Sequence, residues 1–176
     1  LLQIDARHQG ALTGLTAIAL EQKDFAAAEA AYQQVLAADP AYWEALFGLG
    51  VAYIRGEKFQ LAEEALRKAL AIDDQRPDAW LQLGESLFHM NRYEDAQVCY
   101  EKGLELDPNS VSCQVGIGNT FLHLERLDEA IAQYKAVEAV IPNDFRVLAN
   151  LALAYQEVGN FELAHQYGSR AVELGG

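Results

Sequence analysis

Residues 77–110, PDAWLQLGESLFHMNRYEDAQVCYEKGLELDPNS, determine how the rest of the chain is interpreted. Large apolar side chains recur three or four residues apart in the first part of this stretch, and again from Tyr93 onward. That spacing is typical of one apolar face on each of two α-helices. Glu94 and Asp95 favour the start of the second helix, and Pro108 cannot continue it. The stretch therefore predicts a helical hairpin.

The same pattern repeats along the chain without slippage. One alanine series steps by 34 residues, and a leucine or isoleucine series and a mainly aromatic series run in phase with it. The three series are Ala28, Ala62, Ala96, Ala130, Ala164; Leu15, Leu49, Leu83, Ile117, Leu151; and Phe25, Phe59, Tyr93, Leu127, Phe161. A fixed period of this length indicates a stack of equivalent units.

The repeat also fixes where we expect each unit to begin. The expected units are 9–42, 43–76, 77–110, 111–144 and 145–176, preceded by residues 1–8, which match the end of a unit. Each should contain two antiparallel helices, and we find no strand signal. A solenoid normally needs polar caps at its ends, whereas this chain opens with Leu1, Leu2 and Ile4. We therefore expect a segment of a longer protein.

The units resemble tetratricopeptide repeats, the 34-residue helix-turn-helix modules of α-solenoids. Residues 77–110 match the family pattern at Trp80, Leu83, Gly84, Tyr93, Ala96, Tyr100 and Pro108. The stretch departs from the family pattern at Leu87 and Gly103, where the family usually has Tyr and Ala. The fifth unit has Gly168 where other units have tyrosine. The resemblance implies an all-α fold, a right-handed superhelix of antiparallel helical hairpins.

Composition excludes several kinds of partner. The 176 residues contain 13 Lys and Arg against 26 Asp and Glu, a formal net charge of -13, and no basic run that would bind a nucleic acid backbone. No apolar stretch approaches the roughly 18 residues of a membrane span, so we expect no membrane insertion. Two cysteines, expected as reduced thiols, and the lack of a signal-peptide pattern favour a cytoplasmic location.

The sequence predicts neither an enzyme nor a cofactor or metal site. It lacks the phosphate-binding glycine loop, the nucleophile elbow and the zinc-binding HExxH motif. His89 and His123 occupy equivalent positions, but helices about 10 Å apart hold two imidazoles too far apart to share one ion. We interpret both as surface histidines at helix ends.

The resemblance implies that the first helix of each unit lines a concave peptide-binding face. The facing positions are then the second, fifth, sixth, ninth, twelfth and thirteenth of each unit, a set that includes Arg55, Asp78, Gln82 and Ser112. From these positions we select as groove residues Phe47, Val51, Ile54, Leu81, Glu85, Phe88, Val115, Asn119, Leu122, Arg146 and Asn150.

Such a groove would be apolar with an acidic rim. Its chemistry suits a protein or peptide partner that carries some basic residues. One subfamily of these repeats binds the C-terminal carboxylate of its partner with lysine and arginine side chains, and most of those cations are missing from the matching positions of this sequence. Three alternatives remain open. The apolar residues could pack between neighbouring first helices, the chain could be a docking or spacer region of a larger enzyme or of a cell-envelope or secretion assembly, or it could self-associate as a homo-oligomer through open solenoid ends.

Overall fold

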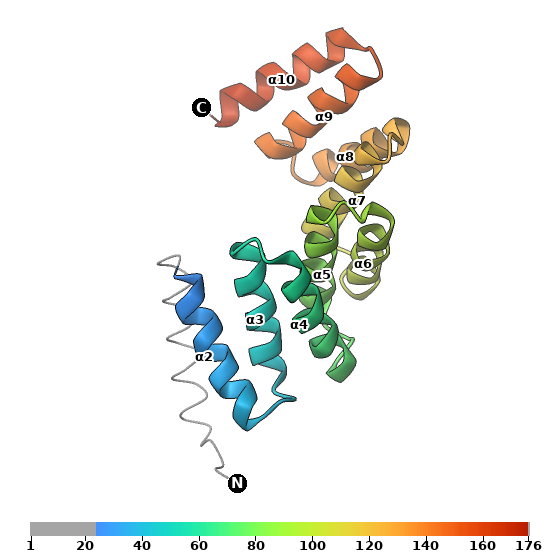
Figure 1. The fold of residues 1–176 in the computed structure, drawn as a ribbon. Coiled ribbons are helices and arrows are strands. Elements are labelled where there is room, and N and C mark those ends of the chain that lie inside the picture. Colours follow the sequence, from blue (N-terminus) through green and yellow to red (C-terminus); the bar gives the residue numbers. More distant parts are fainter. Residues whose placement is uncertain (1–23, 176) are drawn as a thin grey trace. The chain divides into compact units, whose positions relative to one another are not determined.

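The computed structural model describes residues 24–175, and within that range every regular element is an α-helix (Figure 1). The helices are α2 (Phe25–Ala38), α3 (Trp43–Arg55), α4 (Phe59–Ile72), α5 (Pro77–His89), α6 (Tyr93–Leu106), α7 (Val111–His123), α8 (Leu127–Val140), α9 (Phe145–Glu157) and α10 (Phe161–Gly175). The expected all-α solenoid of helical hairpins is confirmed. The tail 1–8 and the whole of the first helix expected in the repeat 9–42 lie outside the described residues.

The ends of the helices follow from local chemistry. The side chains of Asp24, Ser110 and Asp144 accept hydrogen bonds from backbone amides in the first turns of α2, α7 and α9. Each capped amide is one of the donors that a helix start leaves without an intrahelical partner. Proline begins α5, where its fixed φ suits the first helical position and no amide is needed.

The turns inside the hairpins share one unusual backbone conformation. Glu57, Asn91 and Glu125 have φ of 58°, and Gly159 has φ of 79°. These four residues are 34 positions apart, so the repeat extends to the left-handed residue that reverses the chain. Only glycine adopts this region without steric cost, which makes Gly159 the least strained of the four.

The chain divides into two compact units, each larger than one repeat, and the boundary in the sequence lies between Asn91 and Arg92. In the first unit, α2, α3, α4 and α5 pack in sequence, each against the next. Glycines in α3 make room for large side chains from both neighbouring second helices. A Cβ atom at Gly48 would lie 2.4 Å from the Tyr32 ring, and one at Gly50 would lie 2.6 Å from Leu66. These contacts let the helices approach closely.

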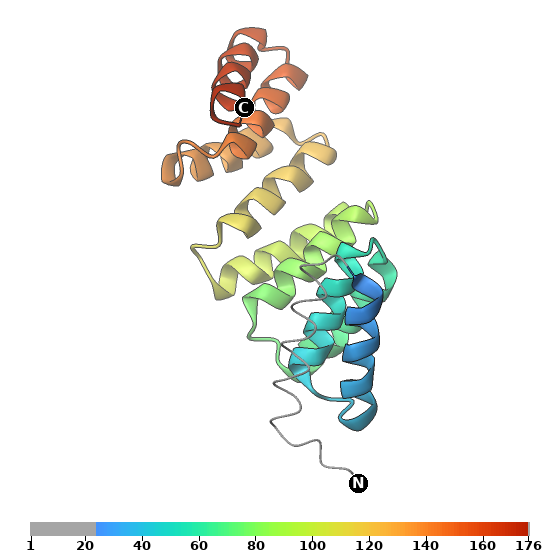
Figure 2. The same cartoon turned by 90° about the vertical axis from the view of Figure 1, so that its left-hand side faces the viewer.

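The second unit repeats this packing with helices α6 to α10, which pack in order along the chain (Figures 1 and 2). The ring of Tyr134 occupies the space where a Cβ atom of residue 118 would lie, and the ring of Tyr100 does the same at Gly116. The core between α8, α9 and α10 is formed by Ala130, Tyr134, Val137, Val147, Leu148, Leu151, Tyr167 and Ala171. Tyr134 is the largest of the fully buried side chains in the described chain.

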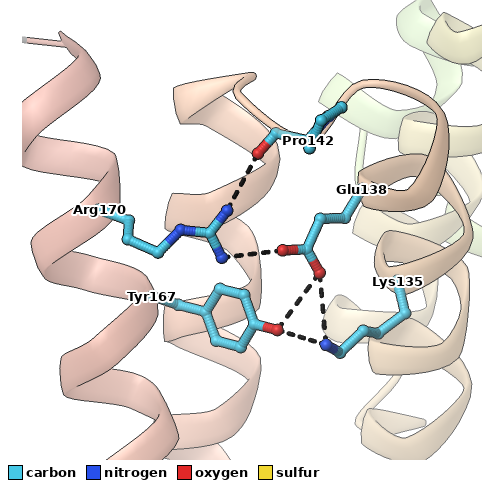
Figure 3. A network of polar contacts seen from close by, with 5 residues as sticks. All are labelled: Lys135, Glu138, Pro142, Tyr167 and Arg170. Carbon is cyan, nitrogen blue, oxygen red and sulfur yellow. Dashed lines mark hydrogen bonds and ion pairs between the residues drawn. The ribbon is translucent and has the colours of Figure 1, made fainter.

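A polar network joins α8 to α10 within the second unit (Figure 3). Glu138 lies at its centre and accepts hydrogen bonds from Lys135 at 3.3 Å, Tyr167 at 3.2 Å and Arg170 at 2.9 Å. Lys135 also donates to the Tyr167 hydroxyl, and Arg170 donates to the Pro142 carbonyl at 3.1 Å. Burial alone would raise the pKa of Glu138, but the hydrogen bonds from Arg170 and Lys135 outweigh it and lower that pKa.

Cys99 and Cys113 are buried thiols. No helix between residues 24 and 175 combines the length and apolar character needed to cross a membrane.

Candidate functional site

The first unit has a hollow between its two first helices, α3 and α5. It encloses about 370 Å³ and is lined by Phe47, Val51, Ile54, Arg55, Asp78, Gln82 and Glu85. Phe47 contacts a residue outside the hollow, because its ring stacks on that of Trp43 with 5.0 Å between centroids. The guanidinium of Arg76 covers the same Trp43 ring at 4.1 Å. One side chain of the apolar wall, Phe47, is therefore held in place by neighbours outside the hollow.

The charged residues of this first hollow lie around its apolar wall. Asp78 and Arg55 are exposed and Glu85 is half-buried. Two carboxylates against one guanidinium leave an excess of one negative charge at the hollow. A ligand that places an apolar side chain on Val51 and a cation beside Asp78 and Glu85 matches this chemistry.

The second unit has a smaller hollow between α7 and α9. It encloses about 280 Å³ and is lined by Val111, Ser112, Val115, Asn119, Arg146, Val147 and Asn150. Arg146 is the only charged residue of this lining, and it forms a two-point contact with Asp144 through Nη2 at 2.7 Å and Nε at 3.2 Å. The hydrogen bonds from Arg146 lower the pKa of Asp144, which also caps α9. The acidic rim expected from the sequence does not extend to the lining of this hollow.

Two asparagines in the second hollow hold each other in a defined orientation. The Oδ1 atom of Asn119 accepts hydrogen bonds from Tyr134 Oη at 2.6 Å and from Asn150 Nδ2 at 2.9 Å. Burial raises the pKa of Tyr134, so its hydroxyl stays protonated and keeps donating. Within residues 24–175 neither Asn119 Nδ2 nor Asn150 Oδ1 has a hydrogen-bond partner. The amide NH2 group of Asn119 and the amide oxygen of Asn150 are thus left over in the half-buried pair.

Eight of the eleven groove residues selected from the sequence line one of the two hollows. They are Phe47, Val51, Ile54 and Glu85 in the first, and Val115, Asn119, Arg146 and Asn150 in the second. Arg55, Asp78, Gln82 and Ser112 also line them, at positions that the family resemblance indicated. Val111 and Val147, at the first and third positions of their units, were missed, and no signal in the sequence distinguished them from core residues.

The other three selected residues are placed elsewhere. Leu81 and Phe88 are half-buried on α5 and line neither hollow. Leu122 packs against the core cluster of the second unit, as Val115 also does. For Leu122 the structure favours the alternative in which an apolar first-helix residue belongs to the packing between helices.

The equivalent histidines stack on equivalent aromatic rings. His89 lies on Phe59 with 4.6 Å between centroids, and His123 lies on Tyr93 with 4.9 Å. Both histidines are exposed at the ends of first helices. Among residues 24–175 no group of three His, Cys, Asp or Glu side chains is placed to hold a metal ion.

Comparison with known protein families places the repeats in a single family. Three family models match in succession, described as tetratricopeptide repeat over residues 18–79, tetratricopeptide repeat over 77–110 and TPR repeat over 118–159. No curated protein sequence matches the chain.

Solved structures with the same fold cover nearly all of the chain. One crystal structure of MamA is 26% identical, with a TM-score of 0.80, and the alignment covers 90% of this chain and 92% of that one. A second MamA structure is 25% identical, with a TM-score of 0.81 and coverage of 93% and 90%. YrrB, titled a TPR protein with an unusual peptide-binding site, is 23% identical, with a TM-score of 0.75 and coverage of 93% and 84%. With three successive family matches and these shared folds, the chain belongs to the tetratricopeptide repeat family.

Proposed function

We propose that this chain is a non-catalytic scaffold that binds segments of a partner protein in the hollows between its first helices. The observation that carries the proposal is the asparagine pair of the second hollow, which offers the amide NH2 group of Asn119 and the amide oxygen of Asn150 beside an apolar wall. Membership of a repeat family and the peptide-binding title of YrrB support the same function.

The second hollow suits the backbone of an extended peptide. Every non-proline residue of such a peptide carries one N–H donor and one C=O acceptor. Asn119 Nδ2 can donate to a peptide carbonyl while Asn150 Oδ1 accepts from a peptide amide. Tyr134 fixes the amide orientation of Asn119, and it is itself fully buried, so little conformational freedom is lost on binding. Val115 would contact the peptide side chains.

The first hollow suits side chains rather than backbone. Phe47, Val51 and Ile54 provide apolar contact, while Asp78 and Glu85 would attract lysine or arginine. The partner segment we propose therefore combines an apolar residue with a basic residue. A basic segment would also be attracted by the chain as a whole, whose net charge is -13.

The proposal can be tested without knowing the partner. A library of random peptides is selected on the 176-residue chain, and the selected peptides are then measured by fluorescence anisotropy against two variants. Val51→Arg fills the first hollow and Val115→Arg fills the second. We expect each variant to weaken binding of its own class of peptides at least about tenfold, which corresponds to about 1.4 kcal/mol.

Matched controls introduce the same side chain outside the hollows. Leu61→Arg lies on α4, where Leu61 is 42% exposed, and Val98→Arg lies on α6, where Val98 is 56% exposed. Both controls should bind the selected peptides as the unaltered chain does, with unchanged helical circular dichroism. Peptides that bind Val51→Arg and Val115→Arg with full affinity would show that neither hollow is the binding site.

A further inference from the structure

The second hollow, between α7 and α9, differs chemically from one end to the other. Its only charged lining residue is Arg146, in the first turn of α9, and the Arg146 side chain is 72% exposed. Ser112, in the first turn of α7, is exposed and lines the same hollow. Asn119 and Asn150 lie further along the same two helices. The hollow therefore has a cationic end at Arg146 and Ser112 and an amide end at the asparagine pair.

Arg146 keeps hydrogen-bond donors for a ligand although it is paired with Asp144. The contact with Asp144 uses Nε and Nη2, and within residues 24–175 Nη1 has no partner. The Asp144 carboxylate is itself shared, because its Oδ1 atom also accepts from the backbone amides of Arg146 and Val147. A carboxylate only accepts hydrogen bonds, and it accepts most strongly from a charged donor. The cationic end therefore suits an acidic group, with the hydroxyl of Ser112 as a second donor.

The distance between the two ends of the hollow fits the spacing of an extended peptide. Arg146 and Asn150 are four residues apart on α9, which corresponds to about 6 Å along the helix axis. Alternate residues of an extended peptide are about 7 Å apart and their side chains point to the same side. When the backbone of one peptide residue binds the asparagine pair, the side chain two positions away is therefore level with Arg146.

We propose that the second hollow selects peptide segments that carry an aspartate or glutamate two positions from the residue bound by the asparagine pair. The carboxylate of that side chain accepts hydrogen bonds from Arg146 Nη1 and from the Ser112 hydroxyl. This preference is opposite to that of the first hollow, where Asp78 and Glu85 favour a basic residue. The inference rests on the proposed function, because it names the side chain that distinguishes the peptides of the second hollow.

An internal acidic side chain is favoured over the carboxylate at the end of a peptide. A terminal carboxylate donates no hydrogen bond, so at the amide end it would leave Asn150 Oδ1 without a partner. An internal residue provides both the N–H and the C=O that the asparagine pair can bind. The net charge of -13 repels acidic peptides over a long range, so a preference for them must arise locally at Arg146. A variant of this one side chain therefore tests the inference.

The experiment uses the peptides selected on the 176-residue chain that lose binding to Val115→Arg but not to Val51→Arg. We expect these peptides to carry Asp or Glu, and replacing that residue by Asn or Gln should weaken binding about tenfold in fluorescence anisotropy. Arg146→Gln should weaken the acidic peptides by the same factor and leave the amide-substituted peptides unaffected. The backbone amide of residue 146 still donates to Asp144 in this variant, so the cap of α9 is kept. Circular dichroism verifies its fold.

The matched control is Arg67→Gln, which removes the same charge from α4, where the Arg67 side chain is 53% exposed and is also paired with a carboxylate. It should bind the acidic peptides as the unaltered chain does. Blocking the peptide C-terminus as an amide should change nothing, and a loss of binding would overturn the inference in favour of a terminal carboxylate. Full affinity of the second-hollow peptides for Arg146→Gln would overturn it and leave the proposed function standing. If no selected peptide responded to Val115→Arg, both would be overturned for this hollow.

Discussion

Single residues decide how closely the helices of this chain approach. The glycines of α3 and α7 are required by volume rather than by backbone conformation, because a large side chain already occupies the position of their Cβ atom. At Gly118 a Cβ would lie 2.5 Å from the ring of Tyr134, which is fully buried and cannot move aside. At Gly168 the same atom has room. The same change should therefore have opposite effects at the two sites.

Gly118→Ala should lower the free energy of unfolding by about 1–3 kcal/mol, the usual cost of overpacking a core. Gly168→Ala should raise it by about 0.5–1 kcal/mol, because alanine loses less backbone entropy in a helix than glycine does. Urea unfolding monitored by circular dichroism at low protein concentration measures both without a contribution from association. A stabilised Gly118→Ala would show that Tyr134 is loosely packed.

Among the elements, α10 is held to α8 by the polar network around Glu138 (Figure 3). Its carboxylate is mostly shielded, with 15% of the side chain exposed, and it is hydrogen-bonded by three groups. We expect Glu138→Gln to destabilise the chain by about 1–2 kcal/mol at neutral pH, since charge-assisted hydrogen bonds are replaced by weaker ones. Glu64→Gln, at an exposed position on α4, is the control and should change the free energy of unfolding little.

The effect of Glu138→Gln should depend on pH in a defined direction. The pKa of Glu138 is lowered in the folded chain, so the folded state binds its proton less readily than the unfolded state does. The stabilisation is therefore complete above the unfolded pKa of about 4.3 and is lost as the pH falls through the lowered folded value. Urea unfolding at pH 7 and at successively lower pH should show the difference between Glu138→Gln and the unaltered chain shrinking below about pH 4. A constant difference would mean that Glu138 acts through packing alone.

The hairpins could be predicted from the sequence because their signals are local and periodic. Four helices begin at the spacing that the alanine series indicates, at Trp43, Pro77, Val111 and Phe145. The hollows were less predictable. Leu122 and Val115 share the apolar character expected of a binding face, yet both contact the core cluster and only Val115 also reaches a hollow. Such a difference arises from how neighbouring helices pack, which residue type and repeat position do not encode.

For the molecule as a whole, the main electrostatic question is whether partner attraction comes from the net charge or from a local site. The formal charge of -13 attracts any basic peptide over a long range, and salt screens this attraction over a distance of about 8–10 Å. The first hollow adds Asp78 and Glu85 at short range. Two variants with the same change in net charge separate these contributions.

Asp78→Asn with Glu85→Gln removes two charges at the hollow, whereas Glu94→Gln with Asp128→Asn removes two exposed charges on α6 and α8. For a lysine-containing peptide selected on the unaltered chain, anisotropy should show about tenfold weaker binding to the first variant and nearly unchanged binding to the second. The dependence of the affinity on salt should also decrease only in the first, because fewer ionic contacts form there. Equal losses in both variants would attribute the attraction to the net charge and leave Asp78 and Glu85 no specific part in recognising basic residues.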